Sequence, residues 1–249
     1  MAVLLLNEPE THHALSRKLV LALHRALDEP AVKQARALVV GSVGPYYCAG
    51  ANIDDLRDGW MNGQEPQSDP VGFFQRLSED PRPSIAAVSG GAIGGGVELM
   101  LSCDLAVASS DAWFSLPELR HGVIPNSALM RLQQMVGLRR MTYAMLTAER
   151  LSSQQALAWG MVNEVVERDA LAAAIDLAKR IVTKVAPGAT AVAKQFAHRH
   201  AGTHWDQVHQ SLQLVPDREW QEGLQAFTDK RPANYDPFWT QQGQDDSKL

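Results

Sequence analysis

Residues 84–101 read SIAAVSGGAIGGGVELML, and this stretch decides the fold. It opens as a short apolar run with β-branched members, which predicts a buried strand over residues 84–88. Glycines then break the run, and the apolar residues from about position 95 onward fit a helix. The three glycines at 94–96 cost chain entropy, so they indicate a backbone that another group must approach closely.

The start of this helix is a candidate anion site, because the first turn of a helix carries free N–H groups and a partial positive charge. Such a turn can stabilise a developing oxyanion, and Glu98 follows immediately inside the helix. A glycine run alone is a weak signal. On these residues alone, a tight turn that carries Glu98 as a solvated first-turn acid is the favoured explanation, so the rest of the chain has to decide.

The composition is that of an ordinary globular protein, since 45% of the 249 residues are hydrophobic and 20% are charged. The 28 acidic and 23 basic residues give a net charge of -5, which argues against a general nucleic-acid or acidic-membrane binder. The apolar start, residues 1–6, is too short for a signal peptide or a membrane span. We therefore expect a cytoplasmic protein of one or two domains.

The two cysteines, Cys48 and Cys103, could form one disulfide, but free buried thiols in a reducing compartment are favoured. No cysteine–histidine spacing suggests zinc, so no metal site is predicted. The paired histidines at 12–13 and at 198 and 200 are expected at the surface.

The chain order predicts an α/β fold. A strand at 2–6, a helix at about 17–28 capped by Ser16, and a strand at 37–41 form a β-α-β unit, which implies a right-handed crossover. Further strands are expected at 104–108, 113–116 and 161–166. Helical patterns are expected at about 52–56 and 127–147, the latter interrupted at Gly137, and from Ser152 or Ser153 to Gly160, with an amphipathic segment at 71–79. Residues 57–70 have the composition of a mobile loop.

We divide the chain into an α/β core over 1–167, a helical region over 168–235, and a frayed tail over 236–249. The helical region is broken at Pro187-Gly188 and at Gly202-Thr203.

A second strand-to-helix turn, Ala49-Gly50-Ala51, resembles the one at 94–96. Ligands of α/β folds bind at the carboxyl ends of strands, so two such turns could offer two N–H donors to one carbonyl oxygen. Glu118 follows Glu98 by one strand and a return, a separation that can bring two carboxylates to one pocket. Such a pair could serve as general base and general acid. No serine elbow, Ser/His/Asp set or phosphate-binding loop is present.

Several segments in one order resemble the crotonase (enoyl-CoA hydratase/isomerase) superfamily, and the resemblance covers about residues 5–235. The segments are CAGANI (48–53), AVSGGAIGGGVEL (87–99), CDL (103–105), FSLPEL (114–119) and LSSQQALAWGMVNEVV (151–166). The resemblance implies a crotonase-like spiral of repeated β-β-α units with a C-terminal helical trimerisation region. Members assemble as homotrimers or as hexamers, and the solvated-acid explanation of Glu98 becomes untenable.

The resemblance further implies an enoyl-CoA hydratase, a lyase of fatty acid metabolism that adds water to a 2-enoyl-CoA. Ala51 and Gly95 would supply the two oxyanion-hole N–H groups. Glu98 and Glu118 would be the catalytic acid and base, with their individual roles open. The substrate would be an acyl-CoA thioester, coenzyme A being part of it, so no cofactor is expected.

The remaining implied positions bind the substrate. They comprise residues flanking the pantetheine, residues along the adenine and thioester path, and residues of the last helix that reach coenzyme A: His13, Ala14, Leu15, Ala49, Gly50, Asn52, Ile53, Gly94, Asn126, Phe227 and Lys230. For the last two, a packing phenylalanine and a surface lysine are an equal alternative. Trp60, Met61, Phe73 and Phe74 would line an acyl tunnel or belong to the core.

The chain departs from the family pattern in three places. The first strand of the usual N-terminal hairpin is absent or very short, and Asn52 replaces an aspartate. Residues 125–132, PNSALMRL, replace a glycine-rich Pro-Gly-x-Gly-Gly-x-x-Arg-Leu run whose backbone N–H helps to place water in hydratases. A side-chain donor of Asn126 or Ser127 could take over that role.

Two alternatives stay open. The same enolate chemistry supports other acyl-CoA reactions, namely double-bond isomerisation, decarboxylation, C–C hydrolysis or dehydration in a secondary pathway. One superfamily branch binds RNA without catalysis, but the net charge and both glutamates argue against that reading.

Overall fold

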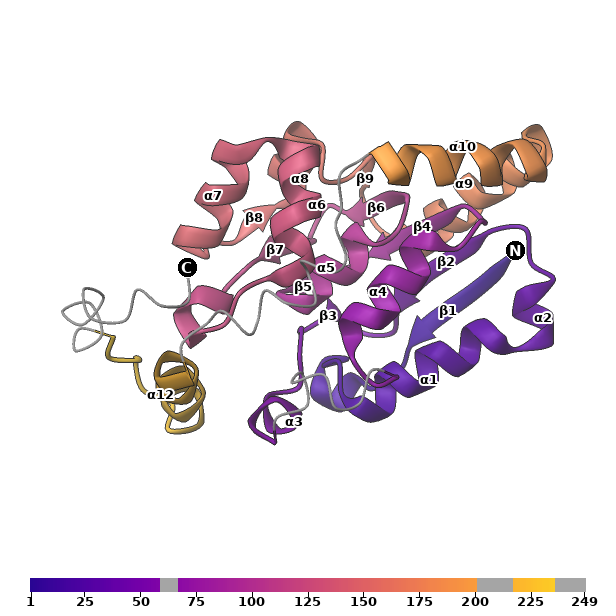
Figure 1. Cartoon of the computed structure of the whole chain (residues 1–249). Coiled ribbons are helices and arrows are strands. Elements are labelled where there is room, and N and C mark those ends of the chain that lie inside the picture. The colour runs from indigo at the N-terminus through magenta and orange to yellow at the C-terminus, as the bar shows by residue number, and fades with distance from the viewer. Residues whose placement is uncertain (59–66, 201–216, 236–249) are drawn as a thin grey trace.

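The computed structural model describes residues 1–58, 67–200 and 217–235, and it shows two sheets surrounded by helices (Figure 1). The larger sheet has the strand order β1-β2-β4-β6-β9, and all its neighbours pair in parallel. Its strands are β1 (Ala2–Leu6), β2 (Leu38–Ser42), β4 (Ser84–Val88), β6 (Leu105–Ser109) and β9 (Glu164–Val166).

The smaller sheet has the order β3-β5-β7-β8, with only the β7–β8 pair antiparallel. Its strands are β3 (Tyr46–Cys48), β5 (Gly91–Ile93), β7 (Trp113–Ser115) and β8 (Leu151–Ser152). The chain therefore alternates between the sheets in the repeated β-β-α order β2-β3-α3 and β4-β5-α5. This alternation confirms the expected α/β spiral.

The helices follow the capping and periodicity signals of the sequence. In α1 the Ser16 hydroxyl accepts a hydrogen bond from the Leu19 N–H at 3.1 Å, and the apolar face of the helix is buried. The helices are α1 (Arg17–Asp28), α2 (Pro30–Lys33), α3 (Ile53–Arg57), α4 (Pro70–Glu79), α5 (Gly95–Leu101), α6 (Asn126–Val136), α7 (Leu138–Thr147), α8 (Ser153–Trp159), α9 (Ala170–Lys184), α10 (Pro187–His200) and α12 (Asp217–Thr228). Two 3-10 turns, η1 (Pro9–Thr11) and η2 (Glu118–His121), complete the set.

The central strands β2, β4 and β6 of the larger sheet are buried on both faces, which explains their unbroken apolar runs, whereas Val3 and Leu5 on the edge strand β1 are exposed. On β2, Leu38 and Val40 pack into the main core, whereas Val39 faces the alanines of α9. The small side chains of Ala170, Ala174 and Ala178 let α9 approach the sheet closely.

Three expectations about elements need correction. The strand at 84–88 does not lead directly into the glycine turn, because β5 intervenes and pairs with β3 and β7 in the smaller sheet. The last strand begins only at Glu164, not at residue 161. His13 is buried rather than at the surface, whereas His12 is exposed.

Helix α12 packs against the core. Three segments lie outside the described residues: 59–66, which includes Trp60 and Met61, then 201–216, and the expected tail at 236–249. A Cβ at Gly223 would lie 2.0 Å from the His121 carbonyl oxygen, so only glycine lets α12 contact η2 this closely. Figure 1 shows α12 and α10 at opposite ends of the molecule. No helix in the described part of the chain is long and apolar enough to span a membrane.

Candidate active site

Two strand-to-helix turns lie against each other at the end of the smaller sheet. One joins β3 to α3 through residues 49–52, and the other joins β5 to α5 through Gly94. A Cβ at Gly50 would lie 2.7 Å from the Ile93 carbonyl oxygen and 3.2 Å from the Gly95 amide nitrogen. Because Gly50 also has a φ of +89°, glycine is required there for both conformation and space.

The amides of Ala51 and Gly95 meet at this contact. A Cβ at Gly95 would lie 3.5 Å from the Ala51 amide nitrogen. The Leu15 N–H donates to the Gly50 carbonyl at 2.7 Å, and the Asn52 N–H donates to the Leu15 carbonyl at 2.9 Å. These bonds fix the backbone on either side of Ala51. Among the described residues, neither the Ala51 N–H nor the Gly95 N–H has a hydrogen-bond acceptor.

Glu98 is held by the N-terminus of α6. Its side chain is almost fully buried, and its Oε1 accepts hydrogen bonds from the Ser127 N–H at 2.7 Å, the Ser127 hydroxyl at 2.9 Å and the Ala128 N–H at 3.0 Å. The partial positive charge of a helix N-terminus adds to these bonds. These bonds stabilise the charged form of the Glu98 carboxylate and oppose the effect of its burial.

Glu118 lies at the start of η2, against the glycine turn that precedes α5. A Cβ at Gly94 would be 2.7 Å from its Oε1, so the carboxyl group rests on the glycine turn that begins α5. Both carboxyl oxygens are buried and have no hydrogen-bond partner among the described residues. A buried carboxyl group without partners is costly as an anion.

The two carboxyl groups are thus placed in opposite environments. Burial raises the pKa of Glu98, but the bonds from Ala128 and Ser127 oppose that rise. Burial raises the pKa of Glu118 well above its usual range, and the neighbouring charge of Glu98 raises it further. Hydrogen bonds offset burial at Glu98 but not at Glu118, so Glu118 is the carboxyl group that holds its proton more readily.

One cavity of about 320 Å³ joins these groups. Both glutamates, both candidate amide donors and most of the expected substrate-binding positions contribute to its wall. The predicted residues that line it are Leu15, Ala49, Gly50, Ala51, Ile53, Gly94, Gly95, Glu98, Glu118, Asn126 and Phe227. Phe74 also lines the cavity, whereas Phe73 packs edge-on against His24 in the core.

Four predicted positions are not among the described residues of the cavity wall: His13, Ala14, Asn52 and Lys230. The Nδ1 atom of His13 accepts a hydrogen bond from the Glu8 N–H, and its Nε2 atom lies 2.7 Å from the Val43 carbonyl oxygen. These contacts hold the loop before α1. Asn52 caps α3 by accepting from the Asp55 N–H at 3.1 Å. Asparagine therefore serves at this helix start in place of aspartate.

Two features of the cavity were not expected from the sequence. Ser127 was considered as a donor to water, but its hydroxyl bonds to Glu98 instead. His121 lines the cavity, three residues after Glu118, and its ring packs edge-on against Phe227 with the centroids 5.3 Å apart. Burial lowers the pKa of His121, and Arg120 adds to the effect, so its surroundings favour the neutral imidazole.

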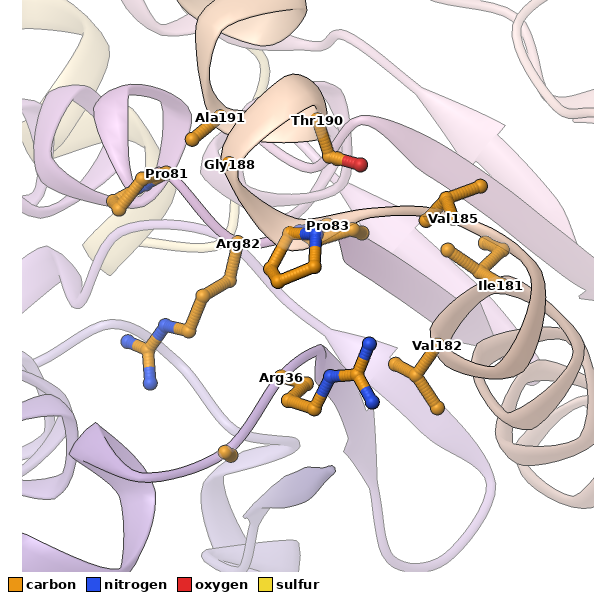
Figure 2. A pocket seen from close by; sticks show the side chains of 12 residues that line it. Arg36, Pro81, Arg82, Pro83, Ile181, Val182, Val185, Gly188, Thr190 and Ala191 are labelled. Atoms are coloured by element: carbon orange, nitrogen blue, oxygen red, sulfur yellow. The ribbon is translucent and has the colours of Figure 1, made fainter.

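A second cavity, of about 270 Å³, lies at the amino ends of β2 and β4 (Figure 2). It is lined mainly by apolar residues of α9 and α10 together with Arg36 and Arg82. The charge of Arg82 is paired with Asp80 at 2.6 Å. Because its described lining carries no carboxylate, and because ligands of α/β folds bind at the carboxyl ends of strands, the first cavity is the candidate active site.

The comparisons with known proteins identify the family of the chain and its fold. The enoyl-CoA hydratase/isomerase family model matches residues 1–239. Crotonyl-CoA hydratase from Syntrophomonas wolfei subsp. wolfei is 30% identical over 94% of each chain. The crystal structure of an enoyl-CoA hydratase from Mycobacterium avium subsp. paratuberculosis K-10 superposes with a TM-score of 0.78 at 25% identity, over 93% of each chain. That of a methylmalonyl-CoA decarboxylase gives the same TM-score, identity and coverage.

Proposed function

The chain belongs to the enoyl-CoA hydratase/isomerase family, and we propose that it adds water across the double bond of a 2-enoyl-CoA. The observation that carries this proposal is the meeting of two buried glutamates and two unbonded backbone amides in one cavity. The relative from Syntrophomonas wolfei is named for the same reaction on crotonyl-CoA. In this proposal coenzyme A is part of the substrate, and no further cofactor takes part.

The amides of Ala51 and Gly95 form the oxyanion hole in this scheme. They donate to the thioester oxygen, which gains negative charge as the enolate forms. Preorganised backbone donors need no rearrangement during the reaction, and one such donor contributes about 3–4 kcal/mol to lowering the barrier. The bonds that fix Leu15 to Gly50 and Asn52 hold the Ala51 amide in position for this task.

Glu98 acts as the base and Glu118 as the acid. The water oxygen bonds to Cβ while the Glu98 carboxylate takes one water proton. The electron pair of the double bond moves through Cα to the thioester oxygen and forms the enolate. When the enolate collapses, Cα takes the proton of Glu118, so the thioester has gained H and OH. After turnover Glu98 is protonated and Glu118 is ionised. Proton exchange with solvent restores the starting states.

The environments of the two carboxyl groups support this assignment of roles. Three donors stabilise the charged form of Glu98, which a base requires. Glu118 has no hydrogen-bond partner among the described residues, and burial together with the charge of Glu98 raises its pKa, which favours the protonated form that an acid requires.

The test is turnover of a panel of 2-enoyl-CoA esters by the wild type and by the variants Glu98→Gln and Glu118→Gln. Each variant removes one proton-transfer group, and we expect kcat to fall by about 10²–10⁴. Arg36→Gln, in the second cavity, is the control and should leave kcat unchanged. Wild-type turnover in both glutamate variants would refute the mechanism.

A second candidate is another acyl-CoA reaction through the same enolate, such as isomerisation or decarboxylation. Two observations support this candidate: the similarity to a methylmalonyl-CoA decarboxylase structure, and the changed loop at 125–132. Incorporation of ¹⁸O from labelled water into product formed from crotonyl-CoA separates the two, because only hydration forms a new C–O bond.

A further inference from the structure

Three buried polar atoms in the candidate active site lack a partner among the described residues. They are both carboxyl oxygens of Glu118 and the side-chain amide nitrogen, Nδ2, of Asn126. Both side chains line the 320 Å³ cavity, and Asn126 is only 3% exposed. Buried polar atoms in folded proteins are almost always satisfied, so these three atoms indicate the position of a small polar ligand.

Asn126 is placed beside Glu98 by the chain itself. It is the first residue of α6, and the two residues after it, Ser127 and Ala128, donate all three bonds to Glu98 Oε1. Those donors are therefore engaged and cannot also hold a ligand strongly. The Nδ2 group of Asn126 is the unengaged donor at this end of α6 within the described residues.

We propose that Asn126 Nδ2 donates a hydrogen bond to the oxygen of the attacking water and to the 3-hydroxyl group that this oxygen becomes. The inference rests on the proposed hydratase function and assigns a further residue to it. The water donates one proton toward Glu98 and accepts from Asn126, which leaves a lone pair directed at Cβ. An amide does not titrate, so it orients the oxygen without taking part in proton transfer.

The competing donor on the cavity wall is His121. Its ring is packed against Phe227, and it belongs to the η2 turn that carries Glu118 rather than to the end of α6 that holds Glu98. A donor there shares the turn of the acid, Glu118, and not the helix end that binds the base. This placement makes Asn126 the better partner for a water that Glu98 deprotonates.

The test compares two reactions that share the enolate but differ in their need for water. Hydration of crotonyl-CoA requires a positioned water. Exchange of the α-hydrogen of butyryl-CoA in D₂O requires only the oxyanion hole and removal of the Cα proton by the fraction of Glu118 that is ionised, followed by return of a deuteron. Loss of Asn126 should therefore separate the two rates.

For Asn126→Ala we expect the kcat of hydration to fall by about 10²-fold, the size of effect that misplacing a reacting group produces. The rate of α-exchange should stay within about threefold, which also shows that the fold and the oxyanion hole are intact. Asn126→Asp keeps the volume but replaces the donor with an acceptor, and it should lose hydration to a similar extent.

Asn163→Ala is the matched control. Asn163 accepts a hydrogen bond from the Ala106 N–H at 2.8 Å in the larger sheet and does not line the cavity in the described structure. Both reactions should be retained in it. Equal loss of hydration and exchange in Asn126→Ala would overturn the proposal, because Asn126 would then support the glutamates or the fold. So would unchanged hydration. Wild-type protein that exchanges α-hydrogen but hydrates no ester would refute the hydratase function itself.

Discussion

At the scale of single residues, Glu98 and Glu118 differ in their surroundings and not in their chemistry. The sequence predicts that both reach one pocket but leaves their roles open, since each is a glutamate at the edge of a turn. The distinction comes from Ser127, which is 29 positions from Glu98 and carries no local signal of that contact. A long-range hydrogen bond of this kind cannot be predicted from one sequence.

The raised pKa of Glu118 has a consequence for stability that Glu118→Gln tests. Above pH 4.5 the unfolded chain carries a charged Glu118, while the buried group takes up a proton on folding. Because the pKa of Glu118 is higher in the folded protein than in the unfolded chain, the free energy of unfolding is highest below the unfolded-state pKa. It falls as the pH rises toward the folded-state pKa. Glutamine removes this loss, so Glu118→Gln should gain stability over the wild type by up to about 1.4 kcal/mol per pH unit above pH 4.5.

Urea denaturation at several pH values between 4.5 and 8 measures this difference, and for the control the series is extended down to pH 2. Glu222→Gln is the control of opposite sign, because the hydrogen bonds from Arg231 lower the pKa of Glu222 to about 2. That variant should lose stability above pH 4.5, and the loss should shrink as pH falls toward 2. A Glu118→Gln gain that does not change with pH would contradict the protonated state of Glu118.

At the scale of elements, local signals predict the helices well. Ser16 and the spacing of Leu19, Leu23 and Leu27 place α1 at the residues where the structure has it. The helix that ends at Gly160 begins with a capping box between Ser152 and Gln155. Strand β5 was missed because its residues, Gly91–Ile93, are mostly poor strand formers. Pairing with β3 and β7 makes them a strand, and that information is not local.

The contact between α5 and β3 gives a prediction at this scale. A Cβ at Gly96 would lie 2.3 Å from the Cys48 carbonyl oxygen, and both belong to backbone that cannot move independently. Gly96→Ala should therefore destabilise the protein by about 3 kcal/mol or more and disturb the turn that carries Gly95. Gly188 in α10 has no atom within 4 Å of its Cβ position, so Gly188→Ala should be neutral or stabilising by up to about 1 kcal/mol. Chemical denaturation measures the free energy of unfolding of both variants. If Gly96→Ala were as stable as Gly188→Ala, the close packing of α5 on β3 would be contradicted.

At the scale of the whole molecule, the sheet alternation explains why the site forms where it does. Each β-β-α repeat sends its second strand to the smaller sheet, so the turns after β3 and β5 become neighbours. The order of strands and turns in the sequence anticipates this arrangement. The family resemblance implies that Phe227 of the last helix reaches the substrate, but it does not reveal the close contact between Gly223 and His121 that brings α12, with Leu224, to the cavity.

The exposed apolar side chains of the outer helices lead to the last prediction. Leu138, Tyr143 and Leu146 on α7 and Phe196 on α10 are large and exposed, with Leu146 at 67%. Large exposed apolar side chains on outer helices are typical of association surfaces, and we propose a homotrimer or a hexamer in solution. Because Leu146 makes little contact within one chain, Leu146→Asp should leave folding intact but weaken assembly. Light scattering over a range of concentrations measures the mass. A monomeric wild type, or an unchanged mass in both Leu146→Asp and Phe196→Asp, would contradict assembly through these helices.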